Sequence, residues 1–144
     1  MKIAFGCDPN ADDFKKHLMK YVEELGHETA DFGSDDPIYA NVAIEVAKAV
    51  ADGQYDRGIV VCGTGIGVSI AANKVKGAYA ACIHDVYQAQ RAALSNNANI
   101  ITMGSQVIGT KLAECMVKEY LSCTYDPNSR SKDKVQRIVD FENE

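Results

Sequence analysis

The sequence predicts a single α/β domain built around an open, mostly parallel sheet of five strands. Five segments that read as strands are each followed by a segment with helical periodicity, an alternation typical of parallel sheets covered by helices. The third strand segment is a continuous apolar stretch, which favours a strand covered on both faces. A length of 144 residues suits one domain with a proper core, so we predict one domain over residues 1–144.

The predicted strands are short apolar runs that end at glycine, aspartate or serine. They span 2–8 (KIAFGCD), 28–34 (ETADFGS), 56–63 (DRGIVVCG), 77–85 (GAYAACIHD) and 98–105 (ANIITMGS). The second is the weakest of the five, and the third leads directly into a turn that holds three glycines. In open parallel sheets, ligands bind beyond the carboxyl ends of the strands, so the residues after each strand are the candidates for function.

The predicted helices repeat apolar residues at the spacing of one helix face. The first places Phe14, Leu18, Val22 and Leu25 on one face and stops at Gly26. The helical segments are 12–27, 39–53, 68–75, 87–97, 109–122 and a last one, basic and then acidic, over about 129–142. The sequence contains no internal repeat, low-complexity segment or linker that would divide the domain.

Composition and charge exclude several classes of protein. Hydrophobic residues make up 47% of the chain and charged residues 24%, which is ordinary for a soluble globular protein. The net charge is −5 and the basic residues are scattered, so we expect no nucleic-acid partner. No apolar run approaches the roughly 18–20 residues that cross a membrane, and the start does not resemble a signal peptide. We therefore expect a cytoplasmic protein without a membrane partner.

Cysteine usage argues against a metal site and a disulfide framework. The five cysteines form no CxxC pair, and the three histidines are scattered among them. Most of these cysteines should be small buried hydrophobes. Cys62 is the exception, because it stands between a strand and the glycine turn.

Polar residues follow four of the predicted strands and should gather at one edge of the sheet. These are Asp8, the turn from Cys62 to Gly67, the His84–Asp85 pair and the Gly104–Ser105 pair. The groups after the first, third and fourth strands could converge on one small ligand. Each also has a plainer interpretation: Asp8 as a helix cap, His84 as a solvated strand end, and Ser95–Asn97 as a helix stop.

The glycine turn has three interpretations. A dinucleotide fingerprint is one, and Asp85 ends the next strand where a ribose-binding acid would stand. However, the spacing is G-x-G-x-G rather than G-x-G-x-x-G, and this interpretation gives Cys62 no role. In the second, a thiol at a helix N-terminus acts as a base and the glycine amides hold an oxyanion, as proton abstraction next to a carbonyl requires. The third is a buried cysteine before a tight turn.

Three segments carry a resemblance to a known family. GCD at 6–8, YDRGIVVCGTGIGVSIAANK at 55–74 and NNANIITMGSQVIG at 96–109 resemble the type B ribose-5-phosphate isomerase and galactose-6-phosphate isomerase family. The resemblance covers nearly the whole chain. It implies a Rossmann-like three-layer α/β/α sandwich and a dimer, or a dimer of dimers, with active sites between subunits. It further implies aldose–ketose isomerisation of phosphorylated sugars of the pentose phosphate type, without a metal or cofactor.

The resemblance assigns the chemistry to the glycine turn. Cys62 would be the base that moves a proton between C1 and C2 of the sugar through an enediolate. The backbone at Gly63, Gly65 and Gly67 would stabilise the enediolate oxygen, and Thr64 would lie near the reacting carbons.

Other residues would contact the sugar around this turn. By the same resemblance, Asp8 and Tyr39 would contact sugar hydroxyls, and Asn96 would lie beside the reacting end. His84, at the end of the fourth strand, could assist proton transfer between the two sugar oxygens.

The last helix carries the predicted phosphate site. In this family, its basic residues reach across the dimer to the phosphate, and the helix would pack on a partner subunit. Here Arg130 and Lys134 stand four apart on one predicted helical face, with Arg137 adjacent. The plainer interpretation is an ordinary solvated charged face.

The chain also departs from the family pattern at three positions. Pro9 replaces a histidine, Ser95 stands where the family has the histidine that opens the sugar ring, and Gln106 replaces an arginine. A tetrose 4-phosphate carries its phosphate on O4 and cannot close a furanose ring, so its isomerase needs no ring-opening group. The segments YAN, HD and RAALSNNA resemble a branch of the family that acts on four-carbon sugar phosphates such as erythrulose 4-phosphate. We expect a tetrose 4-phosphate or a pentose 5-phosphate as substrate.

Three alternatives stay open at this point. The chain could be one subunit of a hetero-oligomeric isomerase of the galactose-6-phosphate type, or a non-catalytic subunit that binds phosphosugars. Both are suggested by the missing histidines at Pro9 and Ser95. The third alternative is a nucleotide-binding module.

Overall fold

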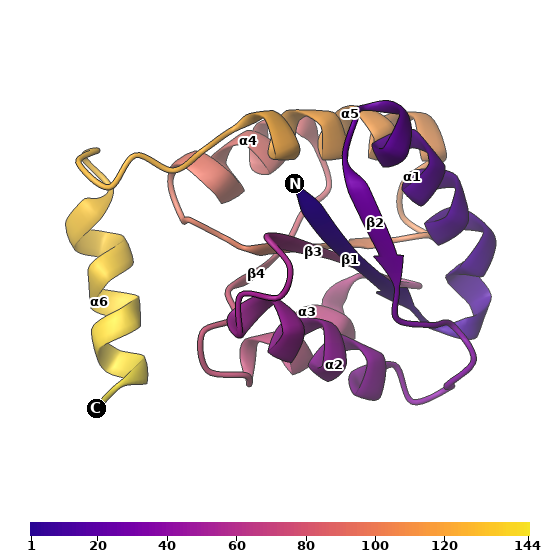
Figure 1. Cartoon of the computed structure of the whole chain (residues 1–144), viewed down its shortest axis with the longest axis horizontal. Helices are drawn as coiled ribbons and strands as arrows, with labels where there is room; N and C mark the ends of the chain where they lie inside the picture. Colours follow the sequence, from indigo (N-terminus) through magenta and orange to yellow (C-terminus); the bar gives the residue numbers. More distant parts are fainter.

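In the computed structural model, which describes residues 1–144, five parallel strands form one sheet and helices cover both of its faces (Figure 1). The strands are β1 (Lys2–Cys7), β2 (Glu28–Asp31), β3 (Arg57–Cys62), β4 (Ala80–Cys82) and β5 (Ile100–Gly104). The helices are α1 (Asp12–Glu24), α2 (Tyr39–Ala51), α3 (Ile66–Asn73), α4 (Val86–Leu94), α5 (Thr110–Ser122) and α6 (Lys132–Glu142), with one 3₁₀ turn, η1 (Pro9–Ala11).

The order of the strands places the carboxyl ends of β1, β3 and β5 side by side at one edge of the sheet. The order is β2-β1-β3-β5-β4, so β5 separates β3 from β4. In register, Cys7 lies opposite Val61, and Cys62 lies opposite Gly104. Because β2 lies on one side of β1 and β3 on the other, the carboxyl ends of β1 and β3 form the switch point where ligands bind in such sheets.

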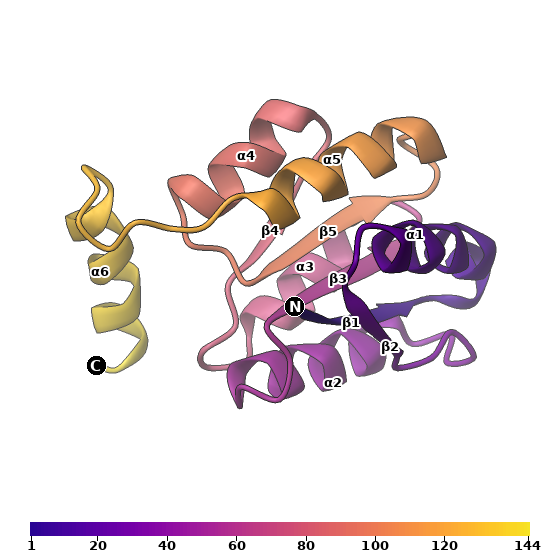
Figure 2. The same cartoon turned by 45° about the horizontal axis from the view of Figure 1, so that its top comes forward.

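Helices lie on both faces of the sheet (Figure 2), and each face has its own apolar core. Helices α1, α4 and α5 cover one face, where Leu18, Ala92 and Met116 pack with Ile59 and Ile101 from the sheet. Helices α2 and α3 cover the other face with a smaller core. Of the four positions that the apolar spacing places on one face of the first helix, Leu18 and Val22 are buried in the larger core and Phe14 packs against it half-buried. Leu25 follows the end of α1 and is exposed, so that position is wrong.

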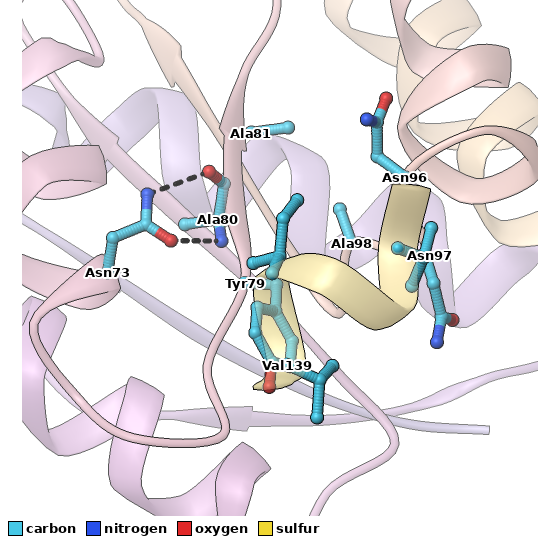
Figure 3. Close-up of a pocket in the computed structure, with 10 residues that line it drawn as sticks. Asn73, Tyr79, Ala80, Ala81, Asn96, Asn97, Ala98 and Val139 are labelled. Atoms are coloured by element: carbon cyan, nitrogen blue, oxygen red, sulfur yellow. Dashed lines mark hydrogen bonds between the residues drawn. The ribbon is translucent and has the colours of Figure 1, made fainter. Parts of the chain in front are cut away.

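The fourth strand is a short sheet edge whose backbone bonds to a side chain. The Asn73 side-chain amide donates to the Ala80 carbonyl at 2.9 Å and accepts from the Ala80 N–H at 2.8 Å. Figure 3 shows this pair of bonds beside β4. Asn73 is the last residue of α3, so the end of that helix is joined to the outer side of the sheet.

Helix α6 stands apart from the sandwich at the end of an extended segment that follows α5 (Figure 1). None of its residues is buried within the chain. The segment before it is fixed by Arg57, whose guanidinium donates to the carbonyls of Tyr120 and Cys123 and lies 4.5 Å from the Tyr120 ring. Tyr120 is itself fully buried and donates its hydroxyl to the Ala98 carbonyl at 2.6 Å.

The predicted α/β/α sandwich and all five predicted strands are confirmed. Several boundaries differ from the prediction, and three of them bear on the site. The helix after the glycine turn begins at Ile66 rather than at 68, β4 spans only Ala80–Cys82 of the predicted 77–85, and α6 begins at Lys132 rather than at 129. None of the helices has the length and apolar character needed to cross a membrane.

Candidate active site

Cys62 is the last residue of β3 and lies at the N-terminal end of α3. Its side chain is only 6% exposed, and its Sγ accepts a hydrogen bond from the Gly65 N–H at 3.2 Å. The turn between strand and helix therefore folds back so that a backbone amide points at the sulfur. An amide in this position, close to the positive end of the helix dipole, stabilises negative charge that develops on the sulfur or on a nearby oxygen.

The turn is fixed to the end of β5 by a set of hydrogen bonds. The Ser105 N–H donates to the Cys62 carbonyl at 2.9 Å, and the Gln106 N–H donates to the Gly63 carbonyl at 3.0 Å. The buried Thr102 hydroxyl donates to the Gly65 carbonyl at 2.8 Å. These bonds hold the amides of the turn in place before a ligand binds, as an oxyanion site requires.

Two glycines allow the turn and β5 to approach this closely. Gly65 has a φ of +80°, and a Cβ on it would lie 2.7 Å from the backbone of Met103. A Cβ on Gly104 would lie 2.6 Å from the Thr64 backbone. The glycines at 65 and 104 thus serve the packing of backbone on backbone.

Tyr39, the first residue of α2, covers the third glycine of the turn. A Cβ on Gly67 would lie 2.3 Å from the Tyr39 ring, so the ring rests directly on the first turn of α3. Tyr39 is 43% exposed, and Thr64, three residues before Gly67 in the turn, is also exposed. The predicted group of Tyr39, Thr64 and the turn glycines is therefore brought together at one surface.

A buried lysine, paired with two partly exposed aspartates, fixes the loop that leads to Tyr39. Lys15 on α1 is fully buried, and its Nζ lies 2.7 Å from Asp31 Oδ1 and 3.4 Å from Asp12 Oδ1. Asp31 also accepts from the Gly33 N–H at 2.8 Å. The loop between β2 and α2 is thereby tied to α1.

Asp8 stands beside Cys62 at the carboxyl edge of the sheet. The register that pairs Cys7 with Val61 continues by one residue, and the Asp8 N–H donates to the Val61 carbonyl at 3.3 Å. Its carboxylate accepts from the Ala11 N–H at 3.1 Å, so it caps η1. The capping interpretation is confirmed, and a second carboxylate oxygen is left for a ligand.

His84 lies at the same edge but farther from Cys62. It follows β4, which β5 separates from β3, and its ring is exposed. The Cys82 Sγ lies 4.0 Å from the Thr64 carbonyl, so the end of β4 does reach the glycine turn. Asp85 caps α4 by accepting from the Gln88 N–H at 2.7 Å.

Asn96 lies at the opposite edge of the sheet from Cys62. It precedes β5, whereas Cys62 is level with Gly104 at the other end of that strand. Four strand steps alone separate the two edges by roughly 13 Å. Within one chain, Asn96 therefore cannot touch the carbon atoms that Cys62 touches, and the prediction that it lies beside the reacting end is not met by one chain alone.

Asn96 instead shares a hollow with the basic residues before and within α6. Ser95, Asn96, Arg130 and Lys134 line a hollow of about 310 Å³ together with Ser131, Val135 and Ile138. No lining residue is acidic, and two carry positive charge, so the hollow suits an anion.

The prediction for the basic residues needs two corrections. Arg130 is not on a helix, because α6 begins at Lys132, so Arg130 and Lys134 meet through the turn before the helix rather than along one face. Arg137 is not in the hollow: it donates to Glu144 at 2.7 Å and lies over the Phe141 ring at 5.7 Å.

A second hollow lies between α6 and the outer edge of the sheet (Figure 3). It has a volume of about 280 Å³ and a mostly apolar lining made up of Asn73, Tyr79, Ala80, Ala81, Asn96, Asn97, Ala98, Val135, Ile138 and Val139. The two hollows share the lining residues Asn96, Val135 and Ile138, so they adjoin beside α6.

Sequence reasoning missed two residues that shape these sites. Thr102 is the one polar residue within the buried run of β5, which marks it as a candidate for an internal hydrogen bond. Arg91 donates to Ser95 at 2.6 Å, and the spacing of four residues on α4 is the signal that could have paired them. No group of three or more His, Cys, Asp or Glu side chains is placed to hold a metal ion.

Comparisons with known proteins agree with this architecture. The sequence model of a protein family described as Ribose/Galactose Isomerase matches residues 3–138. D-erythrulose-4-phosphate isomerase 2 of Mycolicibacterium smegmatis is 44% identical, over 99% of this chain and 97% of that protein. Ribose-5-P isomerase B of Listeria innocua is 43% identical, over 99% and 97% respectively. The structure of ribose-5-phosphate isomerase B from Clostridium thermocellum superposes with a TM-score of 0.93 at 37% identity, covering 99% of this chain and 98% of that one. The chain therefore belongs to the ribose/galactose isomerase family.

Proposed function

We propose that this protein is an aldose–ketose isomerase of a short phosphorylated sugar, with Cys62 as the proton-transfer base and a tetrose 4-phosphate as the favoured substrate. The observation that carries the proposal is the Cys62 sulfur, buried in a glycine turn with the Gly65 N–H at 3.2 Å. The relatives that share the whole length of the chain are named as isomerases of phosphorylated sugars. We place the reaction in the cytoplasm, where such sugars are made and consumed.

The proposed reaction moves one proton between adjacent carbons. The Cys62 thiolate removes the proton from C2 of the aldose, and the electron pair passes to the carbonyl oxygen on C1. The resulting enediolate is stabilised by the amides of the turn from Gly63 to Gly67, which are held rigid by β5. The thiol then returns the proton to C1, while the O2 proton moves to O1. His84 is the proposed carrier between the oxygens, and Asp8 and Tyr39 hold the hydroxyls.

Overall similarity does not separate a tetrose from a pentose, since the two relatives differ by one point of identity, 44% against 43%. Ser95 does separate them. A pentose 5-phosphate closes into a furanose through O4 and needs an acid–base group at the ring oxygen, which a serine supplies poorly near neutral pH. A tetrose 4-phosphate has its phosphate on O4 and stays open. This favours the shorter substrate.

We propose that a second copy of the chain completes each active site. The proton-transfer group with Cys62 and the anion-binding hollow with Arg130 lie at opposite edges of one sheet. Two copies in a symmetric dimer would bring the hollow of one to the cysteine of the other. Exposed apolar side chains support this: Ile66 and Ile70 on α3 are 55% and 59% exposed beside the glycine turn.

The substrate is tested by assaying the purified protein on tetrose, pentose and hexose phosphates. We expect the highest kcat/KM on erythrose or erythrulose 4-phosphate. Efficient turnover of ribose 5-phosphate with weak activity on the tetroses would overturn the proposed substrate. Absence of activity on the whole panel would favour a non-catalytic subunit.

The shared site is tested by mixing two inactive variants. Cys62→Ala lacks the base, and Arg130→Ala with Lys134→Ala lacks the anion-binding cations. If each site draws on two chains, subunits unfolded and refolded together regain activity that neither variant shows alone, because a mixed dimer contains one intact site. The same variants refolded separately and then combined are the control. No gain after co-refolding would contradict a site shared between subunits.

A further inference from the structure

The end of α4 holds an arginine and a serine as a hydrogen-bonded pair. Arg91 is half-buried, and its Nε donates to the Ser95 Oγ at 2.6 Å. Its Nη1 lies 3.5 Å from the Gln90 Oε1, which holds the guanidinium along the helix. Ser95 is the C-terminal cap of α4 and is half-buried beside the anion-binding hollow.

The bond to Arg91 decides what the Ser95 hydroxyl can do. A serine hydroxyl has one proton to donate and two lone pairs that accept, whereas a guanidinium can only donate. Arg91 therefore occupies an acceptor position of Ser95 and leaves the proton of the hydroxyl for another partner. The usual local acceptor, the Arg91 carbonyl one helical turn back, already accepts from the N–H groups of Ser95 and Asn96 at 2.8 and 3.2 Å.

The partner available to this proton lies in the hollow. Ser95 lines it with Asn96, Arg130 and Lys134, and none of the seven lining residues carries a carboxylate. A hydroxyl polarised by a guanidinium, an amide and two cations form a set of donors around one space. Such a set suits a phosphate dianion, whose oxygens only accept.

We propose that Arg91 is a positioning residue that turns Ser95 into a dedicated phosphate donor, and that this pair selects substrates with the phosphate on the fourth carbon. This rests on the proposed function, which places the substrate phosphate in the hollow. In a tetrose 4-phosphate, O4 is the ester oxygen and is bonded directly to the phosphorus atom. In a pentose 5-phosphate, O4 is a hydroxyl or ring oxygen that needs a proton acceptor or donor near neutral pH. Neither Ser95 nor Arg91 exchanges a proton with O4 near neutral pH. The pair therefore binds the phosphate of the tetrose 4-phosphate but does not open the ring of the pentose 5-phosphate.

Binding of inorganic phosphate tests the pair without any turnover. Calorimetric titration is done on the wild type, Ser95→Ala, Arg91→Leu, the conservative Arg91→Lys, and the double variant. We expect Ser95→Ala and Arg91→Leu each to weaken phosphate binding about tenfold, the size of a lost charge-assisted hydrogen bond. The double variant should be no weaker than Ser95→Ala, because Arg91 acts through Ser95. Lys118→Leu, which removes an exposed charge from the neighbouring α5, is the matched control and should leave phosphate affinity unchanged.

Steady-state kinetics on the tetrose phosphate add a second readout. The KM of both single variants should rise in proportion to the phosphate dissociation constant while kcat stays near the wild-type value, whereas a distorted fold would lower kcat. Unchanged phosphate binding in Ser95→Ala overturns the proposal, and so does a double variant in which the two losses multiply. If Arg91→Leu fails to fold, the phosphate affinities of Arg91→Lys and Ser95→Ala alone test the proposal. A wild type that binds phosphate with this pattern but isomerises no sugar would count against the proposed function and leave the phosphate site standing.

Discussion

Glu142, the last residue of α6, accepts a hydrogen bond from the Tyr79 hydroxyl at 2.6 Å and another from the Gly77 N–H at 2.9 Å. These bonds tie the far end of α6 to the body of the protein, across the apolar hollow that Figure 3 shows. Since no residue of α6 is buried, they are the polar contacts that set how the helix stands. The position of Lys134, on the first turn of the same helix, depends on them.

Tyr79→Phe should loosen α6 and weaken substrate binding. A hydrogen bond to a carboxylate is worth about 1.5–3 kcal/mol, and only part of this reaches the substrate through the position of α6. We therefore expect KM to rise about tenfold with kcat unchanged. Amide hydrogen exchange within α6 should become faster. Tyr87→Phe is the matched control, because Tyr87 is 71% exposed on α4. Equal exchange rates and KM in both variants would show that the bond does not position α6.

Cys62→Ala should lower kcat by at least about a hundredfold, the usual effect of removing a general base, while the fold is kept. Cys62→Ser should restore little, since a hydroxyl is a far weaker acid than a thiol. Cys115→Ala, at an exposed position on α5, is the control for loss of a thiol. Near-normal turnover of Cys62→Ala would rule out its proposed role.

Arg130→Ala and Arg137→Ala should differ, although both residues belong to the basic tail. Arg130 lines the hollow that we propose binds the substrate phosphate, so its loss should raise KM and abolish protection by free phosphate against thermal unfolding. Arg137 is paired with Glu144, and its loss should change KM little. A common effect of the two substitutions would mean that the tail acts through its overall charge.

Alanine at the turn glycines should separate stability from binding. Gly65→Ala meets the Met103 backbone at 2.7 Å and a φ of +80°, so it should destabilise the fold by roughly 1–3 kcal/mol in denaturant unfolding. Gly67→Ala meets only the half-exposed Tyr39 ring, which can move, so it should raise KM more than it lowers stability. Gly109→Ala has nothing within 4 Å and serves as the control. Equal destabilisation at all three positions would contradict the close packing.

Stability should fall in alkaline solution. Burial raises the pKa of Cys7 from 9.0 to about 12, and burial together with the bond to Glu142 raises the pKa of Tyr79 from 10.0 to about 12. The folded state therefore holds these protons more tightly than the unfolded state. Their contribution to stability is complete below pH 9 and is lost as the pH rises towards 12. Urea unfolding across this range should show a declining free energy, with a smaller decline in Cys7→Ala.

The sequence predicts the alternation of strands and helices because apolar periodicity is a local property of the chain. It does not predict that β5 lies between β3 and β4, because several strand orders bury the same apolar faces. The predicted parallel sheet already implies that Asn96, before the fifth strand, and Cys62, at the end of the third, lie at opposite edges, and the register of β3 with β5 agrees. The family resemblance places both residues at one substrate, and this is the part that a single chain does not reproduce.

The sequence predicts which residue types form the candidate site better than it predicts how those residues pack. The glycines could be read as a cradle for a dinucleotide, yet Gly65 is covered by Met103 and Gly67 by Tyr39. The missing side chains of these two glycines therefore make room for neighbouring protein groups and not for a dinucleotide. The bond between Arg91 and Ser95 depends on side-chain rotamers, which the order of residues does not encode directly.

The side-chain amide of Asn73 has a consequence for whether another chain can add to the sheet at β4. It uses both the N–H and the carbonyl of Ala80 on the outer side of β4, as a neighbouring strand would. The strand itself is only three residues long, so this side of the sheet offers little template for another chain. Edge-to-edge growth of the sheet, the usual route from exposed strands to aggregation, is therefore blocked at β4.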